Sequence, residues 1–296
     1  MRIRELARAT VGSIAVHGSS KQEMGELNAA ALRSISSERA YREVLAAYFR
    51  WLRANRLPLN EVHTRTMMLE FLDEYAEAHA QKSVNQAIQA LAKIFSVRLP
   101  RVESCIISHV HGRAYPFEDV QKILARQTED NQFGTLLCYD GGLRAHECWT
   151  LREPRGEGPS SHREWSPDRF AGRTDFVVFL VTGKGGLVRE VAISRELAEA
   201  LRTRARPAPI IVRDREINYV SYFDIGGGQA LSASFSYASK RALGYSLGLH
   251  GMRHSFAQNR LTTLIPLLGS KQALKVLSVE LGHFRPSISL AYLVGG

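Results

Sequence analysis

Several residues in the second half of the chain have the types and spacing needed to act on a phosphate ester. They lie in five short segments, GGLRAHE, TGKGG, LHGMRHSFA, LGHFRPS and SISLAYL. The side chains of interest are, in order, Arg144, Glu147, Lys184, His250, Arg253, His283 and Tyr292. A phosphodiester under attack gathers negative charge on its non-bridging oxygens, so its transfer requires positioning and preorganised positive charge. Arginine suits this task, because its rigid guanidinium fork matches two phosphate oxygens at once.

The first half of the chain is predicted to be helical. From Ser37 onward, apolar residues recur at a spacing of 3.6 residues and form one stripe, and Ser37 itself is a suitable N-cap. The stripe consists of Tyr41, Val44, Leu45, Tyr48, Phe49 and Leu52. Similar patterns predict a second helix over Thr64 to Ala78 and a third over Ser83 to Val97. These helices predict a compact helical unit of about a hundred residues.

Helical periodicity fails between Val97 and Pro116, where two prolines and a glycine interrupt the apolar pattern, which indicates a linker. We therefore predict a helical domain over residues 1–100, a linker over 101–116 and a second domain over 117–296. Within the second domain, the stretch Glu153–Arg173 is rich in Pro, Gly, Ser and charge, and we expect it to be a loop or insertion.

The β signal is confined to one hairpin. Asp175–Val181 (DFVVFLV) is β-branched and aromatic, a turn with three glycines carries Lys184, and Arg189–Ile193 (REVAI) returns as a second strand. From about Ser194 the pattern predicts helix again, apart from a polar and Gly-rich loop around Asp224–Gln229. The expected fold is thus mainly α with a small antiparallel β-sheet.

The five segments resemble, in order and spacing, the motifs of the tyrosine recombinases, also called the phage-integrase family. That family has an arginine in a GLR-x-x-E segment, a lysine on a β-hairpin, H-x-x-R-H, then LGH, and a tyrosine nine residues after the last histidine. Here Tyr292 stands nine residues after His283. The resemblance covers roughly Phe117 to the C-terminus, and the helical unit before it is similar to the family's core-binding domain. Any one motif is common, but all five in order are a specific signal.

The resemblance implies that Tyr292 is the nucleophile, whose phenolate attacks the scissile phosphate to give a 3′-phosphotyrosyl enzyme. Because this covalent step conserves the bond energy, strands can be rejoined without ATP. Arg144 and Arg253 would hold the non-bridging oxygens. The enzyme would act as a homotetramer on two duplexes through a Holliday junction.

The same resemblance assigns four supporting roles. Lys184 would donate a proton to the departing 5′-oxygen, His250 would manage the proton of the tyrosine, and His283 would hydrogen-bond a phosphate oxygen. Glu147 would support the placement of the first arginine. No cofactor and no metal are implied, since the sequence has no HExxH, no carboxylate cluster and no cysteine pair at ligand spacing.

Three features depart from the family pattern. Forty positions separate Arg144 from Lys184, more than simple members show, and the Glu153–Arg173 stretch accounts for the excess. The interval from Arg253 to His283 is also somewhat long. Only four residues follow Tyr292, so either the chain is truncated or its subunits are coupled by a contact other than a C-terminal tail.

Charge and composition agree with a DNA partner. The net charge of +10 and the sequence pI of about 9.7 favour a polyanion. We expect double-stranded DNA carrying a specific recombination site, with or without accessory proteins, and an affinity that falls steeply with salt. Phosphate contacts from the helical unit are expected from the arginines that lie off its apolar stripe, although a solvated helix face explains them equally well. They are Arg42, Arg50, Arg53 and Arg56.

Other classes are disfavoured by simple counts. Three cysteines without CxxC spacing favour a reducing compartment, and the charged N-terminus and the lack of a long apolar run predict a cytoplasmic protein without a membrane partner. Three alternatives stay open to test. They are a topoisomerase-like or resolvase-like enzyme that uses the same centre, a catalytically silent DNA-binding accessory protein, and a metal nuclease, which the lack of clustered acids disfavours. We expect His63, His146 and His254 to be structural or surface residues.

Overall fold

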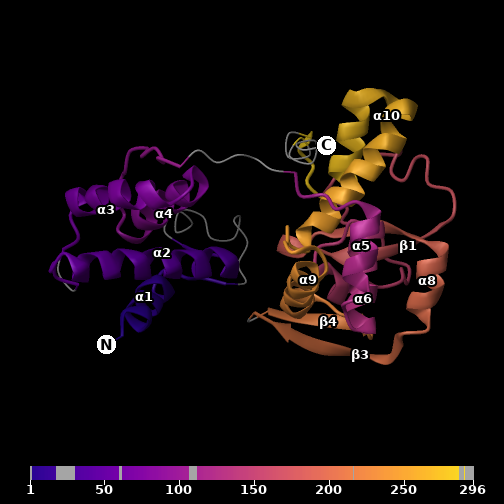
Figure 1. Ribbon diagram of the computed structural model, residues 1–296, viewed down its shortest axis with the longest axis horizontal. Helices are drawn as coiled ribbons and strands as arrows, with labels where there is room; N and C mark the ends of the chain where they lie inside the picture. Colours follow the sequence, from indigo (N-terminus) through magenta and orange to yellow (C-terminus); the bar gives the residue numbers. More distant parts are fainter. Residues whose placement is uncertain are drawn as a thin grey trace. The chain divides into compact units, whose positions relative to one another are not determined.

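The computed structural model describes residues 2–17, 31–59, 62–106, 112–215, 217–286 and 290. The chain divides into two compact units, Met1–His109 and Val110–Gly296. Both are traced in Figure 1, where the first unit is indigo to purple and the second runs from magenta to yellow. Each unit has its own hydrophobic core.

The described part of the first unit is helical. Its helices are α1 (Ile3–Gly12), α2 (Ile35–Ala54), α3 (Arg65–Ala78) and α4 (Gln81–Ile94). Helix α2 begins two residues before the predicted N-cap Ser37, with Ser34 in the capping position. Thr64 caps α3, because its Oγ1 accepts a hydrogen bond from the backbone N–H of Met67 at 3.3 Å. The three predicted helices are therefore confirmed, with ends shifted by at most three residues.

The apolar stripe of α2 builds the core of this unit. Tyr48 and Leu52 are fully buried, and the Tyr48 ring meets Phe71 of α3 edge to face at 5.2 Å. The chain after α4 stays on this unit: the amide of Ser104 donates to Gln81 Oε1 at 2.8 Å, and the amide of Cys105 donates to a carbonyl of α3 at 3.0 Å. Burial of one face of each helix thus holds the unit together.

In its described residues, the second unit joins six helices to two small sheets. The helices are α5 (Phe117–Leu124), α6 (Glu129–Asp140), α7 (Glu147–Thr150), α8 (Arg195–Arg202), α9 (Gly228–Leu243) and α10 (His250–Glu280). The strands are β1 (Phe176–Thr182), β2 (Val188–Ser194), β3 (Ala205–Asp214) and β4 (Ile217–Phe223). Helix α10 bends at Gly269, whose φ of 73° is left-handed, so Figure 1 shows it as two segments. A mainly α fold with small antiparallel sheets is therefore confirmed.

The predicted β-hairpin is present. Strands β1 and β2 pair antiparallel, with Val181 opposite Arg189, and a short 3-10 turn, η2 (Lys184–Gly186), connects them. Gly185 and Gly186 have φ values of 75° and 79°, a backbone conformation that residues with a Cβ rarely adopt. The glycines of TGKGG therefore allow the chain to reverse directly beside Lys184.

A second hairpin was not predicted from the sequence. Residues 205–223, expected to be helical, form the antiparallel pair β3–β4. The alternation of polar and apolar residues is weak there, because β3 contains Pro207 and Pro209 and is exposed along most of its length. Ile210 and Ile211 are 44% and 64% exposed. Since neither face is fully buried, the binary pattern of a strand is missing and only the β-branched residues indicate it.

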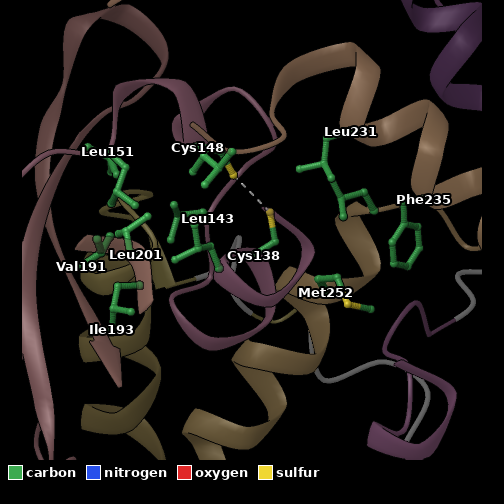
Figure 2. Packing of buried hydrophobic residues seen from close by; sticks show 14 of the residues in the cluster. Cys138, Leu143, Cys148, Leu151, Val191, Ile193, Leu201, Leu231, Phe235 and Met252 are labelled. Carbon is green, nitrogen blue, oxygen red and sulfur yellow. Dashed lines mark hydrogen bonds between the residues drawn. The ribbon is translucent and has the colours of Figure 1, made fainter. Parts of the chain in front are cut away.

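The core of the second unit lies between α6, α9, α10 and the β1–β2 hairpin. Figure 2 shows Leu143, Ile193 and Phe235 converging on it. Two buried thiols face each other in the same core, with 3.7 Å between Cys138 Sγ and Cys148 Sγ. Apolar side chains thus fix the residues on either side of the loop that leads into α7. Among the described residues, no helix is long and apolar enough to cross a membrane.

Replacing Gly134 in α6 by alanine is expected to destabilise the protein. A Cβ there would collide with the carbonyl oxygen of Gly226 and lie 2.8 Å from Leu231 Cδ2, which outweighs the gain of about 1 kcal/mol in helix propensity. We expect Gly134→Ala to lower the free energy of unfolding by about 1–3 kcal/mol in urea denaturation. Gly12→Ala in α1 is the control, since no atom lies within 4 Å of its Cβ. Equal stability of the two variants would contradict the packing described for α6.

Candidate active site

A buried carboxylate fixes Arg144. Gly142, with φ of 61°, turns the chain after α6, and Arg144 follows two residues later in the loop before α7. Glu147, the first residue of α7, has no exposed surface. Its Oε1 accepts a hydrogen bond from Arg144 Nη1 at 2.7 Å, and its Oε2 accepts one from the Arg144 backbone N–H at 2.9 Å. The i+3 spacing noted in the sequence is thus a direct ion pair, and the Arg144 side chain keeps 27% of its surface exposed.

Two further guanidinium groups approach the same carboxylate. Arg189 Nη2 donates to Glu147 Oε2 at 2.7 Å, and Arg253 Nη1 lies 3.8 Å from that oxygen. Burial raises the pKa of Glu147, but the charges of Arg189, Arg253 and Arg144 outweigh this and hold the pKa well below its ordinary value. Glu147 is therefore ionised, and the cluster of three arginines and one glutamate, hereafter the arginine cluster, keeps two net positive charges.

Arg253 connects three stretches of chain. It lies in the first turn of α10 and is only 1% exposed. Its Nη1 donates to the carbonyl of Gly142, its Nη2 donates to the carbonyl of Leu281, and the same Nη2 is 3.4 Å from His283 Nε2. The start of α10, the end of α10 and the loop before α7 are thereby held at one point.

The two predicted site histidines share the field of the arginine cluster. His250 is the first residue of α10 and is exposed. Partial loss of water around its ring lowers its pKa to about 4, together with the charge of Arg253 and smaller effects that include Arg144. Burial and the charges of Arg253, Arg144 and Arg189 lower the pKa of His283 to about 3. Both rings are therefore neutral at pH 7. His254, expected to be structural, is buried with its ring centroid 5.4 Å from that of His250.

The turn that carries Lys184 lies beside the arginine cluster. A Cβ placed on Gly183 would lie 3.1 Å from Glu147 Oε1 and 3.9 Å from Arg144 Nη1. Thr150 of α7 also binds Thr182 at the end of β1 through two hydrogen bonds of 3.0 Å. The backbone of the turn is therefore fixed next to Arg144, while the Lys184 side chain lies outside the described part of the structure.

The other predicted site residues are Tyr292 and four arginines of the first unit. Tyr292 lies outside the described residues. In the first unit, Arg42 is ion-paired with Glu38, whose side chain is buried, and Arg50 donates from Nε to a backbone carbonyl of the preceding turn at 3.1 Å. Arg50, Arg53 and Arg56 are exposed. No cluster of three potential metal-ligating His, Cys, Asp or Glu side chains occurs among the described residues.

Arg189 was not singled out in the sequence. It is buried, and it also donates from Nη1 to the carbonyl of Glu280 at 2.8 Å. A signal was present, because Arg189 shares an inward strand face with Val191 and Ile193, where a charged residue requires a buried partner. The strand that returns from the Lys184 turn therefore contributes to the arginine cluster as well.

Glu147→Gln should strongly destabilise the protein, because the amide keeps the shape but leaves three guanidinium groups without their anion. We expect the free energy of unfolding to fall by about 3 kcal/mol in urea denaturation. Glu157→Gln is the matched control: its carboxylate is 42% exposed and pairs with Arg152 at 3.1 Å, so we expect a loss of about 1 kcal/mol or less. Comparable losses in both variants would refute the central place of Glu147.

The histidine rings should titrate far below their ordinary value of about 6.5. NMR of the free protein with ring-labelled histidine, assigned with His250→Gln and His283→Gln, should give titration midpoints of about 4 for His250 and about 3 for His283. Because the unfolded chain binds these protons first, the free energy of unfolding should fall as the pH drops from about 6.5 to about 3. Midpoints near the ordinary value would show that the two rings do not feel the arginine cluster.

Comparison with solved structures identifies the fold, whereas no family model and no curated protein matches the sequence. XerH site-specific recombinase bound to difH substrate, in a pre-cleavage complex, matches with a TM-score of 0.55 at 18% identity, covering 98% of this chain and 91% of that one. A lambda integrase(75-356) dimer bound to a COC′ core site matches with a TM-score of 0.54 at 14% identity, covering 97% and 95%. The chain therefore has the fold of the tyrosine recombinases.

Proposed function

We propose that this protein is a site-specific DNA recombinase that breaks and rejoins DNA through a 3′-phosphotyrosyl intermediate. The observation that carries the proposal is the convergence of Arg144 and Arg253, from distant stretches of sequence, on one buried carboxylate. His283 lies 3.4 Å from Arg253, and the charges of both arginines act on His250. The turn with Lys184 lies beside the same carboxylate. These cationic and neutral donors suit the negatively charged, pentacoordinate transition state of phosphoryl transfer better than a neutral substrate.

Arg144 is the guanidinium that a DNA phosphate meets first. It is part-exposed, whereas Arg253 and Arg189 are almost fully buried. Because Glu147 and backbone carbonyls hold the three groups before DNA arrives, their charge requires little reorganisation during the reaction. Arg253, which is buried beside His283, would stabilise the charge on the non-bridging oxygens.

The proposed reaction is a transesterification at phosphorus. The phenolate oxygen of Tyr292 forms a bond to phosphorus, the bond from phosphorus to the 5′-oxygen breaks, and Lys184 gives its proton to that oxygen. A 5′-hydroxyl from a second duplex then attacks the phosphotyrosine and releases the tyrosine. Two such exchanges pass through a Holliday junction and require a homotetramer on two recombination sites. No cofactor takes part in this scheme.

Neutral histidines fit this chemistry. At pH 7 an uncharged His250 can accept the proton of the attacking phenol. An uncharged His283 can donate one ring N–H to a phosphate oxygen. The entering phosphate is negative, so it opposes the arginine charges that depress the pKa of both rings and makes proton uptake easier when DNA is bound.

We assign the two units the parts that the resemblance implied: the first, Met1–His109, contains the predicted core-binding domain (1–100), and the second, Val110–Gly296, contains the predicted catalytic domain (117–296). The predicted linker, 101–116, spans the division between them. Exposed arginines of the first unit, Arg50, Arg53 and Arg56, are free of ion pairs among the described residues and suit DNA phosphates. Arg42 is the weaker candidate, because its guanidinium already pairs with Glu38. Binding is expected to lose affinity steeply as salt rises.

Tyr292→Phe should bind DNA like the wild type and form no covalent adduct, because only the phenolic oxygen is removed. The test uses a library of nicked duplexes with randomised sequence, in which the cleaved strand loses the short fragment needed for rejoining. Adducts are isolated under denaturing conditions and sequenced. Tyr237→Phe is the control, since Tyr237 is 69% exposed on α9 and should form adducts normally.

Each outcome distinguishes one class of protein. An adduct in Tyr292→Phe contradicts the proposal, and the absence of any wild-type adduct favours a silent DNA-binding protein. Adducts without sequence preference, together with relaxation of plasmids that lack a selected site, favour a topoisomerase-like enzyme. Cleavage that stops when a chelator is added favours a metal nuclease.

A further inference from the structure

The irregular segment between α7 and β1, residues 153–173, is attached to the beginning of β2. The backbone N–H of Val188 donates to Ser160 Oγ at 2.9 Å, and the N–H of Ser160 donates to the carbonyl of Val188 at 3.0 Å. Trp165 Nε1 then donates to the carbonyl of Ser160 at 2.9 Å. Val188 is the first residue of the strand that follows the Lys184 turn, so the segment is fixed to the outgoing side of that turn.

The same segment contacts the residue that follows His283. The rings of Trp165 and Phe284 meet edge to face with 5.0 Å between centroids, and Arg163 Cζ lies 5.2 Å from the centroid of Phe284. Phe284 has φ of 55°, a conformation that is costly for a residue other than glycine and persists only where its surroundings maintain it. The aromatic contact supplies such surroundings at the step directly after His283.

The far end of the segment is bonded to α10 by buried groups. The N–H of Phe170 donates to Glu280 Oε1 at 3.0 Å, and Arg260 Nη2 donates to the carbonyl of Ala171 at 3.0 Å. Arg260 and Glu280 also form a buried ion pair at 2.8 Å. These bonds hold the segment in place, and they do so without Trp165.

Trp165 is thus separable from the anchors that bond the segment to α10. Its side chain and Phe284 are both half-buried, and neither belongs to the buried cores of the second unit. Removing the indole ring leaves the ion pair of Arg260 and Glu280 and the core packing intact. The contact with Phe284 therefore serves a local purpose rather than the stability of the whole unit.

We propose that residues 153–173 form a brace for the proposed active site, in which Trp165 is a positioning residue. By holding Phe284, Trp165 keeps His283 next to Arg253 and sets the direction in which the chain leaves toward Tyr292, eight residues further on. Through its hydrogen bond to Ser160, Trp165 also connects Phe284 to Val188, the first residue of the strand after the Lys184 turn. This inference rests on the proposed function for its catalytic consequence.

The test compares Trp165→Ala with His162→Ala, a control at an exposed position of the same segment. On a nicked duplex recovered from wild-type adducts, we expect Trp165→Ala to lower the single-turnover rate of adduct formation by about tenfold or more, as small misplacements of reacting groups do. Its DNA affinity and melting temperature should stay close to those of His162→Ala. Trp165→Phe, which keeps a ring against Phe284, should recover most of the rate.

A second readout does not depend on DNA. In the free protein, the ring signal of His283, assigned with His283→Gln, should shift in Trp165→Ala and stay in place in His162→Ala. Should Trp165→Ala fail to fold, Trp165→Leu keeps the apolar bulk without the ring and should show the same shift. A wild-type adduct rate, or an unmoved His283 signal, overturns the brace. A moved signal in a protein whose wild type forms no adduct supports the brace and refutes the recombinase function.

Discussion

The second unit depends on the burial of one carboxylate. Glu147 has no exposed surface, and removing a carboxylate from water costs several kcal/mol unless cations and hydrogen bonds replace the water. Its partners Arg144, Arg189 and Arg253 come from the loop before α7, from β2 and from α10. The three stretches are required together, because the loss of any one of them leaves a buried charge insufficiently compensated.

This arrangement also sets the charge that a ligand meets. Three guanidinium groups alone would repel one another, and one carboxylate makes their proximity tolerable while two net positive charges remain. Burial of the rings, together with this field, lowers the pKa of His250 and His283 and keeps both neutral. The carboxylate that stabilises the packing therefore leaves an excess of positive charge, which an anionic ligand can neutralise.

Much of this could be predicted from the sequence, wherever the pattern was local. The stripe on α2, the glycine turn at Lys184 and the i+3 pair of Arg144 and Glu147 all depend on neighbours along the chain. Arg189 was missed because charged residues in a strand are ordinarily assigned to its solvent face. The β3 strand was missed because two prolines and general exposure remove the alternation that marks a strand. Placement of Tyr292 lies outside the described residues, so its role stays a prediction.

Residues 153–173 show where local patterns stop being informative. Their composition correctly indicates a segment without helix or strand, but composition does not say which distant groups such a segment contacts. Trp165 and Phe284 are separated by more than a hundred positions, and only the folded chain brings the rings within 5.0 Å. A loop has no backbone ladder to fix its course, so a few side-chain contacts must do so. Through the contacts of Trp165 and Ser160, residues 153–173 can therefore affect the placement of His283 without contacting a ligand themselves.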